Sequence, residues 1–428
     1  MTTLKKKLSS LAVAAAMAGL AQSAGAGGFA IGTQSGSGTG NAFSGGAAGA
    51  EDASVAWSNP AAMMALPAGK QFTAAGHFLR PSFKFSNTGS TGPFFAAPGD
   101  GGDGGSWAVV PNLFFTTDIN PQWRFGIAVN APFGLSTEYD TGWRGQLTAL
   151  KSAIKSVNIN PSLAYKVSNT VAIGAGINVQ KLDAELSGFA GSAAAGVLTL
   201  NADDIGYGAN LGLLVQATPS TRFGVSYRSS IKYDLEGTAG FSGTAGALLG
   251  SSVRADLRVP ESASASFFTA VSPNWELMGD ITWTGWSRVQ QLDVIRTTDR
   301  LLPGGAAGTT LTSLAFRWDD TWRFGLGANY KINGQTKIRF GVAFDQTPTN
   351  DATRTPRLPD QDRTWLAFGV QHKVSKAGVL EVGYAHEFVR DASVNVPVPG
   401  FTTCAAGCLT GRFEDKADII SVQYSHSF

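Results

Sequence analysis

The sequence predicts an all-β fold: a 14-stranded antiparallel transmembrane β-barrel with an N-terminal plug inside the lumen. Three observations support this prediction. From Thr321 to the end, apolar residues alternate with Gly, Asn, Arg and Lys, and the apolar side is rich in aromatic and β-branched residues. The connections between such segments alternate between short and long, and an export signal precedes them. Together these features are typical of strands that lie between lipid and a polar lumen.

Residues 1–26 have the pattern of a secretory signal peptide. Lys5, Lys6 and Lys7 form a basic region, and a short apolar stretch follows from Leu8 to Leu20. Small residues then give a cleavage site after Ala26. The apolar stretch is shorter than the ~20 residues that a membrane-spanning helix needs.

Residues 27–67 do not alternate. The stretch from Gly28 to Leu66 is rich in Gly, Ala and Ser and has no run of period two. A large barrel is an open pore unless something fills its lumen. We therefore expect residues 27–67 to form a plug and residues 68–428 to form the barrel.

The barrel region divides into fourteen candidate strands separated by six short and seven long connections in strict alternation. That order is expected of a barrel with an even number of strands and both chain ends in the periplasm. The predicted strands are 69–86, 106–117, 122–135, 156–167, 170–186, 203–218, 220–236, 253–271, 274–290, 314–331, 335–346, 361–374, 378–390 and 416–428.

The register of each strand follows from the cost of placing a charge in lipid. Lys337 and Arg339 alternate with Ile338 and Phe340. A lipid-facing Lys or Arg near the bilayer midplane costs roughly 2–4 kcal/mol. We therefore expect both cations to face the lumen.

Composition excludes several functional classes. Only 15% of residues are charged, and removing residues 1–26 changes the formal charge from +2 to −1 because three lysines are lost. This balance gives no support for a nucleic-acid partner. The two cysteines, Cys404 and Cys408, lie in one loop of an exported chain, which favours a local disulfide over a metal site. The sequence indicates no cofactor and no metal.

Several segments of the chain resemble the FadL/OmpP1/TodX family, in order and over nearly the whole mature chain. They are Gly28-Phe29, Gly36 to Gly45, Glu51-Asp52-Ala53, Asn59-Pro60-Ala61, Pro132 to Tyr139, Asn160 to Lys166, Thr282 to Ser287, Asp319 to Arg323, Gly341 to Asp345 and Arg354 to Trp365. The resemblance implies a barrel plugged by an N-terminal hatch. It also implies passive uptake of hydrophobic molecules, most often long-chain fatty acids, that leave through a gap in the wall at a kinked third strand.

The resemblance assigns roles to particular residues. Asn59, Pro60 and Ala61 match the hatch motif beside the wall opening, and Pro132 and Gly134 mark the expected loss of pairing in the third strand.

The expected ligand-binding residues are of two kinds. Phe29 and Ile31 are candidates for the apolar lining of the pocket. Lys181 and Arg317 are candidates for holding a carboxylate, although the strand position at which the family offers an arginine falls near Asp183. The cargo is therefore open between fatty acids and neutral aromatic or aliphatic hydrocarbons.

Two other classes of protein fit the sequence less well. A lipid hydrolase would need a nucleophile with a base and an orienting group, and the four histidines and the lack of Gly-x-Ser-x-Gly give no such pattern. A general porin would not contain a long plug. We therefore expect a transporter without catalytic residues.

The ends of the chain also predict its location and partners. The last strand finishes at Phe428, and an aromatic carboxy-terminus resembles the signal read by the barrel-assembly machinery of Gram-negative bacteria. We expect a monomer in the outer membrane of such a bacterium, in contact with membrane lipid and lipopolysaccharide and transiently with that machinery.

Overall fold

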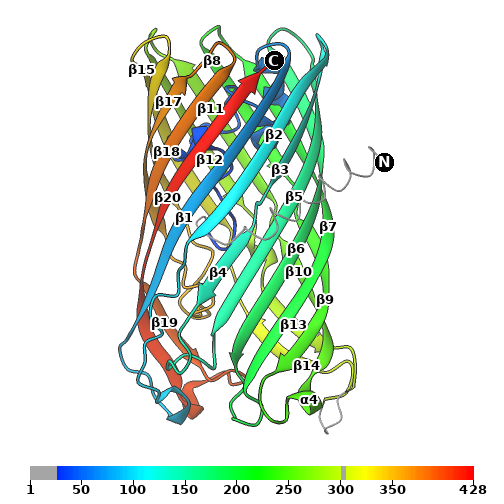
Figure 1. Ribbon diagram of the computed structural model, residues 1–428, viewed down its shortest axis with the longest axis vertical. Helices are drawn as coiled ribbons and strands as arrows, with labels where there is room; N and C mark the ends of the chain where they lie inside the picture. The colour runs from blue at the N-terminus through cyan, green and yellow to red at the C-terminus, as the bar shows by residue number, and fades with distance from the viewer. Residues whose placement is uncertain (1–26, 300–304) are drawn as a thin grey trace.

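The computed structural model describes residues 27–299 and 305–428, so the predicted signal peptide lies outside the described residues. One antiparallel sheet closes on itself because β1 (Lys70–Asn87) pairs with β20 (Cys408–Ser427). Figure 1 shows the resulting tall cylinder, with short turns at the end where the C-terminus lies and long loops at the other end. In the described part of the chain, no helix has both the length and the apolar character needed to cross a membrane.

Twenty strand segments form fourteen wall strands, which confirms the predicted fold and strand number. Eight wall strands are continuous: β1, β2 (Ala108–Asn120), β5 (Lys151–Lys166), β6 (Val171–Phe189), β7 (Val197–Gln216), β16 (Thr336–Asp345), β17 (Arg363–Lys373) and β20. Six are interrupted: β3 (Trp123–Asn130) with β4 (Gly134–Glu138), β8 (Thr221–Arg228) with β9 (Ile231–Phe241), β10 (Ser251–Val259) with β11 (Ser262–Ala270), β12 (Trp275–Thr284) with β13 (Gln291–Arg296), β14 (Thr310–Ala315) with β15 (Thr321–Lys331), and β18 (Gly378–Val389) with β19 (Ala392–Pro397).

The helical segments are all short. Those before the first strand are α2 (Gly36–Thr39), α3 (Val55–Ser58) and η1 (Pro60–Ala65). Those in the long loops are η2 (Pro93–Phe95), α4 (Gly246–Leu249) and η4 (Cys404–Ala406), and the disulfide between Cys404 and Cys408 closes the turn at η4. One more, η3 (Trp286–Arg288), lies in the interruption between β12 and β13.

In the half of the barrel nearest the short turns, the two faces of the wall are sorted as predicted. Phe324 and Leu326 are 46% and 61% exposed on the outside, whereas Asn329 on the alternate face is fully buried in the lumen. Lys337 and Arg339 also face inward, where they form ion pairs. The charged side chains of this half therefore avoid the lipid.

In the half nearest the long loops, the sorting is reversed. Tyr233, Leu235 and Leu257 face inward and are buried, while their strand neighbours Lys232 and Asp234 face outward. The buried side chains join one apolar cluster inside the barrel. Alternation continues with the same period, but its polarity changes where the wall leaves the lipid.

Residues 27–66 run inside the cylinder, where Figure 1 shows them in blue. Glu51 ties this segment to the wall: its carboxylate lies 2.7 Å from Lys337 Nζ and 2.5 Å from Arg339 Nη2. The hatch also presses closely on the wall, since a Cβ at Gly224 would lie 1.9 Å from the Ala47 carbonyl oxygen. Glycine at such a position allows the hatch backbone to approach the strands.

Candidate functional site

The third wall strand is broken between β3 and β4. The last pair of β3 with β2 is Leu113 with Val129. Beyond it β4 pairs with β5, and no pairing with β2 is present among the described residues. The wall therefore loses its ladder between the second and third strands at 131–133.

The start of the hatch pairs with this break from inside. The Ile31 amide donates to the Pro132 carbonyl at 2.8 Å, and the Gly134 amide donates to the Phe29 carbonyl at 2.8 Å. Ala30 and Phe133 thereby form an antiparallel bridge. The backbone groups released from the wall are thus satisfied by the hatch, as buried backbone groups must be.

Polar side chains hold the next hatch residues at the same place. Asn130 Nδ2 donates to Gln34 Oε1 at 2.5 Å, and Gln34 Nε2 donates to the Ala131 carbonyl at 3.2 Å. Across the break, Asn112 Nδ2 on β2 donates to the Thr33 carbonyl at 3.1 Å. The hatch is therefore hydrogen-bonded to both strands that border the break.

Two prolines flank the break. If the register of β2 with β3 continued past Leu113 and Val129, Pro111 would face Ala131 and Val110 would face Pro132. Neither proline has an N–H to donate to a ladder. The sequence analysis identified Pro132 but missed Pro111.

Aromatic side chains gather beside the break. The Phe29 ring lies 4.9 Å from Trp286, 5.6 Å from Trp318 and 5.8 Å from Phe133, measured between centroids. All four rings belong to the apolar cluster inside the half of the barrel nearest the long loops. Such a cluster offers an apolar surface to a hydrophobic ligand.

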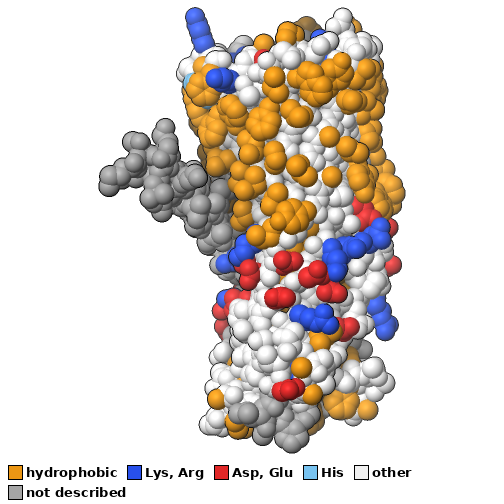
Figure 2. Space-filling model, turned by 90° about the vertical axis from the view of Figure 1, so that its right-hand side faces the viewer, with side chains coloured by type: hydrophobic (Ala, Val, Ile, Leu, Met, Phe, Trp, Pro, Cys, Tyr) orange, Lys and Arg blue, Asp and Glu red, His pale blue; other side chains and the backbone are white. Residues whose placement is uncertain are grey.

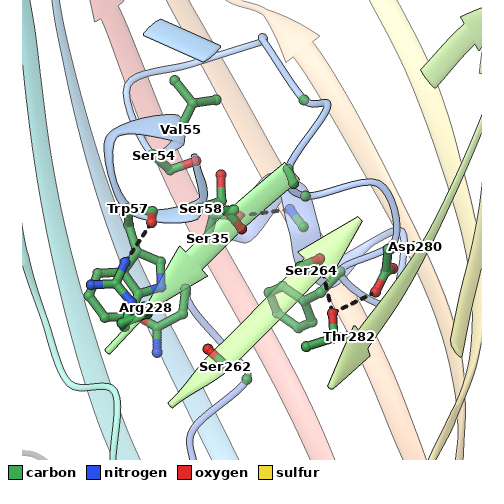
Figure 3. Close-up of a pocket in the computed structure, with 18 of the residues that line it drawn as sticks. Ser35, Ser54, Val55, Trp57, Ser58, Arg228, Ser262, Ser264, Asp280 and Thr282 are labelled. Carbon is green, nitrogen blue, oxygen red and sulfur yellow. Dashed lines mark hydrogen bonds between the residues drawn. The ribbon is translucent and has the colours of Figure 1, made fainter. Parts of the chain in front are cut away.

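A cavity of about 350 Å³ lies on the short-turn side of this cluster, between the hatch and the wall. Its size is at the lower end of the roughly 300–1,000 Å³ that is usual for small-molecule sites. Ile31, Phe133, Ile231 and Val259 line its apolar end. Figure 3 shows the polar end, where Ser54, Trp57 and Ser58 of the hatch face Arg228, Ser262, Ser264 and Thr282 of the wall.

Arg228 places a positive charge in this cavity. Its guanidinium carbon lies 3.3 Å from the centroid of the Trp57 ring, and Nη2 donates to the Trp57 carbonyl at 2.8 Å. Nη1 donates to Asn178 Oδ1. Among the described residues, no carboxylate lies within ion-pairing distance of Arg228. The cavity therefore contains a fixed cation whose positive charge has no acidic partner.

Of the four predicted ligand-binding residues, two lie at or next to the cavity and two do not. Ile31 lines the cavity, and Phe29 lies in the aromatic cluster on the long-loop side of the cavity. Lys181 does not: it shares the outward face of β6 with Ile177 and pairs with Asp183 and Asp203. Lys181 is therefore on the outside of the barrel, contrary to expectation, because polar residues face outward in the half nearest the long loops.

Arg317 also lies away from the cavity. It occupies the connection between β14 and β15 with a left-handed φ of 50°, and its backbone bonds with Gln290 and Asn350. The expectation that it contacts cargo in the cavity is therefore not met by the geometry.

Asn59, Pro60 and Ala61 are buried at the junction of α3 and η1. Asn59 Nδ2 donates to the carbonyls of Ala47 at 2.6 Å and Leu213 at 3.0 Å, and Asn59 Oδ1 accepts from the Ala61 amide. These contacts are with the hatch itself and β7, and not with the break at 131–133. Asn59 therefore fastens the hatch to the wall, which the sequence motif alone did not indicate.

Comparison with known proteins agrees with this architecture. Residues 17–428 match the family model described as outer membrane protein transport protein (OMPP1/FadL/TodX). The long-chain fatty acid transport protein of Escherichia coli K12 is 28% identical over 432 residues, covering 90% of this chain and 93% of the relative. The crystal structure of a Pseudomonas aeruginosa FadL homologue superposes with a TM-score of 0.84 at 25% identity, covering 94% of this chain and all of that one.

A second solved structure shows the same fold at lower identity. The Pseudomonas putida toluene transporter TodX superposes with a TM-score of 0.66 at 18% identity, over 96% of this chain and 100% of that one. Since the family model spans almost the entire sequence, the chain belongs to the outer membrane protein transport family (OMPP1/FadL/TodX).

Proposed function

We propose that this protein takes up hydrophobic molecules, most often long-chain fatty acids, across the outer membrane without an energy source. The observation that carries this proposal is the apolar interior of the barrel beyond the membrane. There, inward side chains such as Tyr233, Leu235 and Leu257 form one cluster that reaches the aromatic rings around Phe29. A hydrophobic ligand that enters from outside the cell contacts apolar surface as far as the cavity. The relative from E. coli, named as a long-chain fatty acid transporter, supports the same cargo class.

The break in the third strand is the proposed exit. It opens the wall at the level of Pro132 and Gly134, next to the cavity that Ile31 and Phe133 line. A ligand that leaves there enters the bilayer directly and avoids the aqueous side of the lumen. Movement of the hatch residues Phe29 to Gln34 away from the break would free this opening, and it would break their hydrogen bonds to the wall and the packing of Phe29.

A neutral aromatic or aliphatic hydrocarbon is the second candidate cargo. The rings of Phe29, Phe133, Trp286 and Trp318 contact one another, and in the described part of the chain no Arg or Lys stacks on them. Arg228, a cation of the cavity that forms no ion pair among the described residues, favours a carboxylate instead. One chain contains the cavity and the break, so a monomer suffices for this function, and the exposed Phe428 after β20 suits transient recognition by the assembly machinery.

Uptake of labelled oleate tests the function. Cells of a Gram-negative host that lack their own fatty-acid transporter should take up oleate when this protein is expressed. Folded barrel in the outer membrane without uptake of either oleate or a labelled alkane would contradict the proposal.

The exit is tested by restoring a donor at the break. Pro132→Val supplies an N–H group on the side where the Pro132 carbonyl now accepts from the hatch, and we expect further pairing of β2 with β3 and slower uptake, while binding of oleate to purified protein stays unchanged. Pro161→Val is the matched control, because Pro161 lies in a stretch of β5 already paired with Ile127. New protection of residue 132 against hydrogen exchange with unchanged uptake would exclude this exit.

A further inference from the structure

The outer face of β5, β6, β7, β9 and β10 carries a band of charges just beyond the apolar belt. Figure 2 shows this band between the hydrophobic surface and the long-loop end. Six basic and six acidic residues point outward here, in balance. They are Lys151, Lys155, Lys181, Lys232, Arg254 and Arg258 with Asp183, Glu185, Asp203, Asp234, Glu236 and Asp256.

Within the band, β9 and β10 place like charges directly opposite each other in two of their three outward charged pairs, and the third pair joins Glu236 with Arg254. Lys232 faces Arg258, and on the next outward position Asp234 faces Asp256. Like charges directly opposite each other in a sheet are destabilising. The arrangement is therefore more favourable when a ligand of opposite charge lies on it.

The cationic pair is the one nearest the membrane. Along the wall strand formed by β8 and β9, Tyr227 is the last large apolar residue that faces outward, at 43% exposure, and Lys232 is the first outward charge after it. On the neighbouring wall strand Ala263, which pairs with Tyr227, marks the same level, and Arg258 follows it outward. Lys232 and Arg258 therefore lie where the headgroups of the outer leaflet begin.

Arg258 is open to a partner. Lys232 Nζ lies 2.6 Å from Asp234 Oδ1, but Arg258 forms no ion pair within 4 Å among residues 27–299 and 305–428. A guanidinium binds phosphate through two parallel hydrogen bonds, and a lysine beside it adds a second charge.

We propose that Lys232 and Arg258 form a docking site for the phosphorylated headgroup of lipopolysaccharide in the outer leaflet. The sugar phosphates lie on the cationic pair, and the acyl chains lie along the apolar belt on the short-turn side of the pair. This site faces the membrane rather than the lumen, so it is independent of the cargo.

Binding of fluorescent rough lipopolysaccharide to the purified barrel in neutral detergent tests the site. Because each basic residue adds to binding at an anionic surface, Lys232→Gln with Arg258→Gln should weaken binding by roughly thirtyfold. The matched control is Lys373→Gln with Lys376→Gln, which removes the same charge from exposed residues at the short-turn end and should leave binding unchanged. Arg258→Lys should keep most of the binding.

Two further probes identify what is recognised. Lipopolysaccharide stripped of its phosphates should bind the native barrel as weakly as intact lipopolysaccharide binds the double variant. Phosphatidylglycerol vesicles and free inorganic phosphate should not compete at equal phosphate concentration. Equal binding by the double variant and the native barrel, an equal loss in the control variant, or tight binding of the phosphate-free glycolipid would each overturn the proposal.

Discussion

Replacing Arg228 by Gln should reduce the binding of a fatty acid but not of a neutral chain of the same length. Arg228 already uses two of its five N–H groups, one on Asn178 and one on the Trp57 carbonyl, so three remain for a ligand. A hydrogen bond to a charged group contributes roughly 1.5–3 kcal/mol. Since 1.4 kcal/mol is a factor of ten, the dissociation constant of palmitate should rise about 10- to 150-fold.

The comparison of palmitate with hexadecanol isolates the charge. Hexadecanol has the same chain without a carboxylate, so its affinity should change less than about threefold, which corresponds to under ~0.7 kcal/mol. Displacement of a fluorescent fatty acid from purified protein measures both ligands. Arg222→Gln is the matched control, because Arg222 lies on the same strand, stacks on Phe268 at 4.3 Å and donates to Ala48. Equal losses for palmitate and hexadecanol, or no loss for palmitate, would refute the assignment of Arg228 to the carboxylate.

Two predictions concern how the hatch is held. Glu51→Gln removes the ion pairs of the hatch with Lys337 and Arg339 of β16, and should lower the free energy of local hatch opening by about 2 kcal/mol. This is less than the roughly 3–5 kcal/mol lost when a buried charge is left without any partner, because each cation keeps a second carboxylate. Hydrogen exchange of residues 40–60 measures this, with Glu185→Gln in an exposed pair as a control that should cost under ~1 kcal/mol. Gly224→Val should displace the Ala47 backbone and raise the steady conductance in planar bilayers, whereas Gly240→Val, with open space around it, should not; a closed channel in the first variant would contradict the seating described here.

The number of wall strands could be predicted because turn chemistry and period-two alternation are local properties of the sequence. The ends of the strands could not. The last strand begins at Cys408 and not at residue 416, and the fourth begins at Lys151 and not at residue 156. In both cases the missing residues lie at the long-loop end, where inward residues are apolar and outward residues are polar. The prediction assumed that apolar residues face outward to lipid, and it therefore assigned these residues to loops.

The site was predictable only where the chain itself supplies the signal. Ile31 lines the cavity and Phe29 lies in the adjacent aromatic cluster, and their role in ligand binding stays a prediction. Arg228 could have been found by parity, because it alternates with the outward Val225 and Tyr227. Trp286 and Trp318 could not, because they stand in irregular connections whose path depends on packing against Phe29.

The reversal of polarity along the wall links the fold to the proposed function. A barrel that was polar inside along its whole height would expose a hydrophobic cargo to water before it reached the break. A barrel that was apolar inside along its whole height could not hold a hatch by charged groups such as Glu51 and Arg339. Here the inner face changes from polar to apolar at the level of Ile231 and Val259, which belong both to the apolar cluster of the long-loop half and to the cavity. The cavity thus lies at the boundary where the apolar path ends and the hydrogen-bonded hatch begins, and that boundary is the height at which a lateral exit is needed.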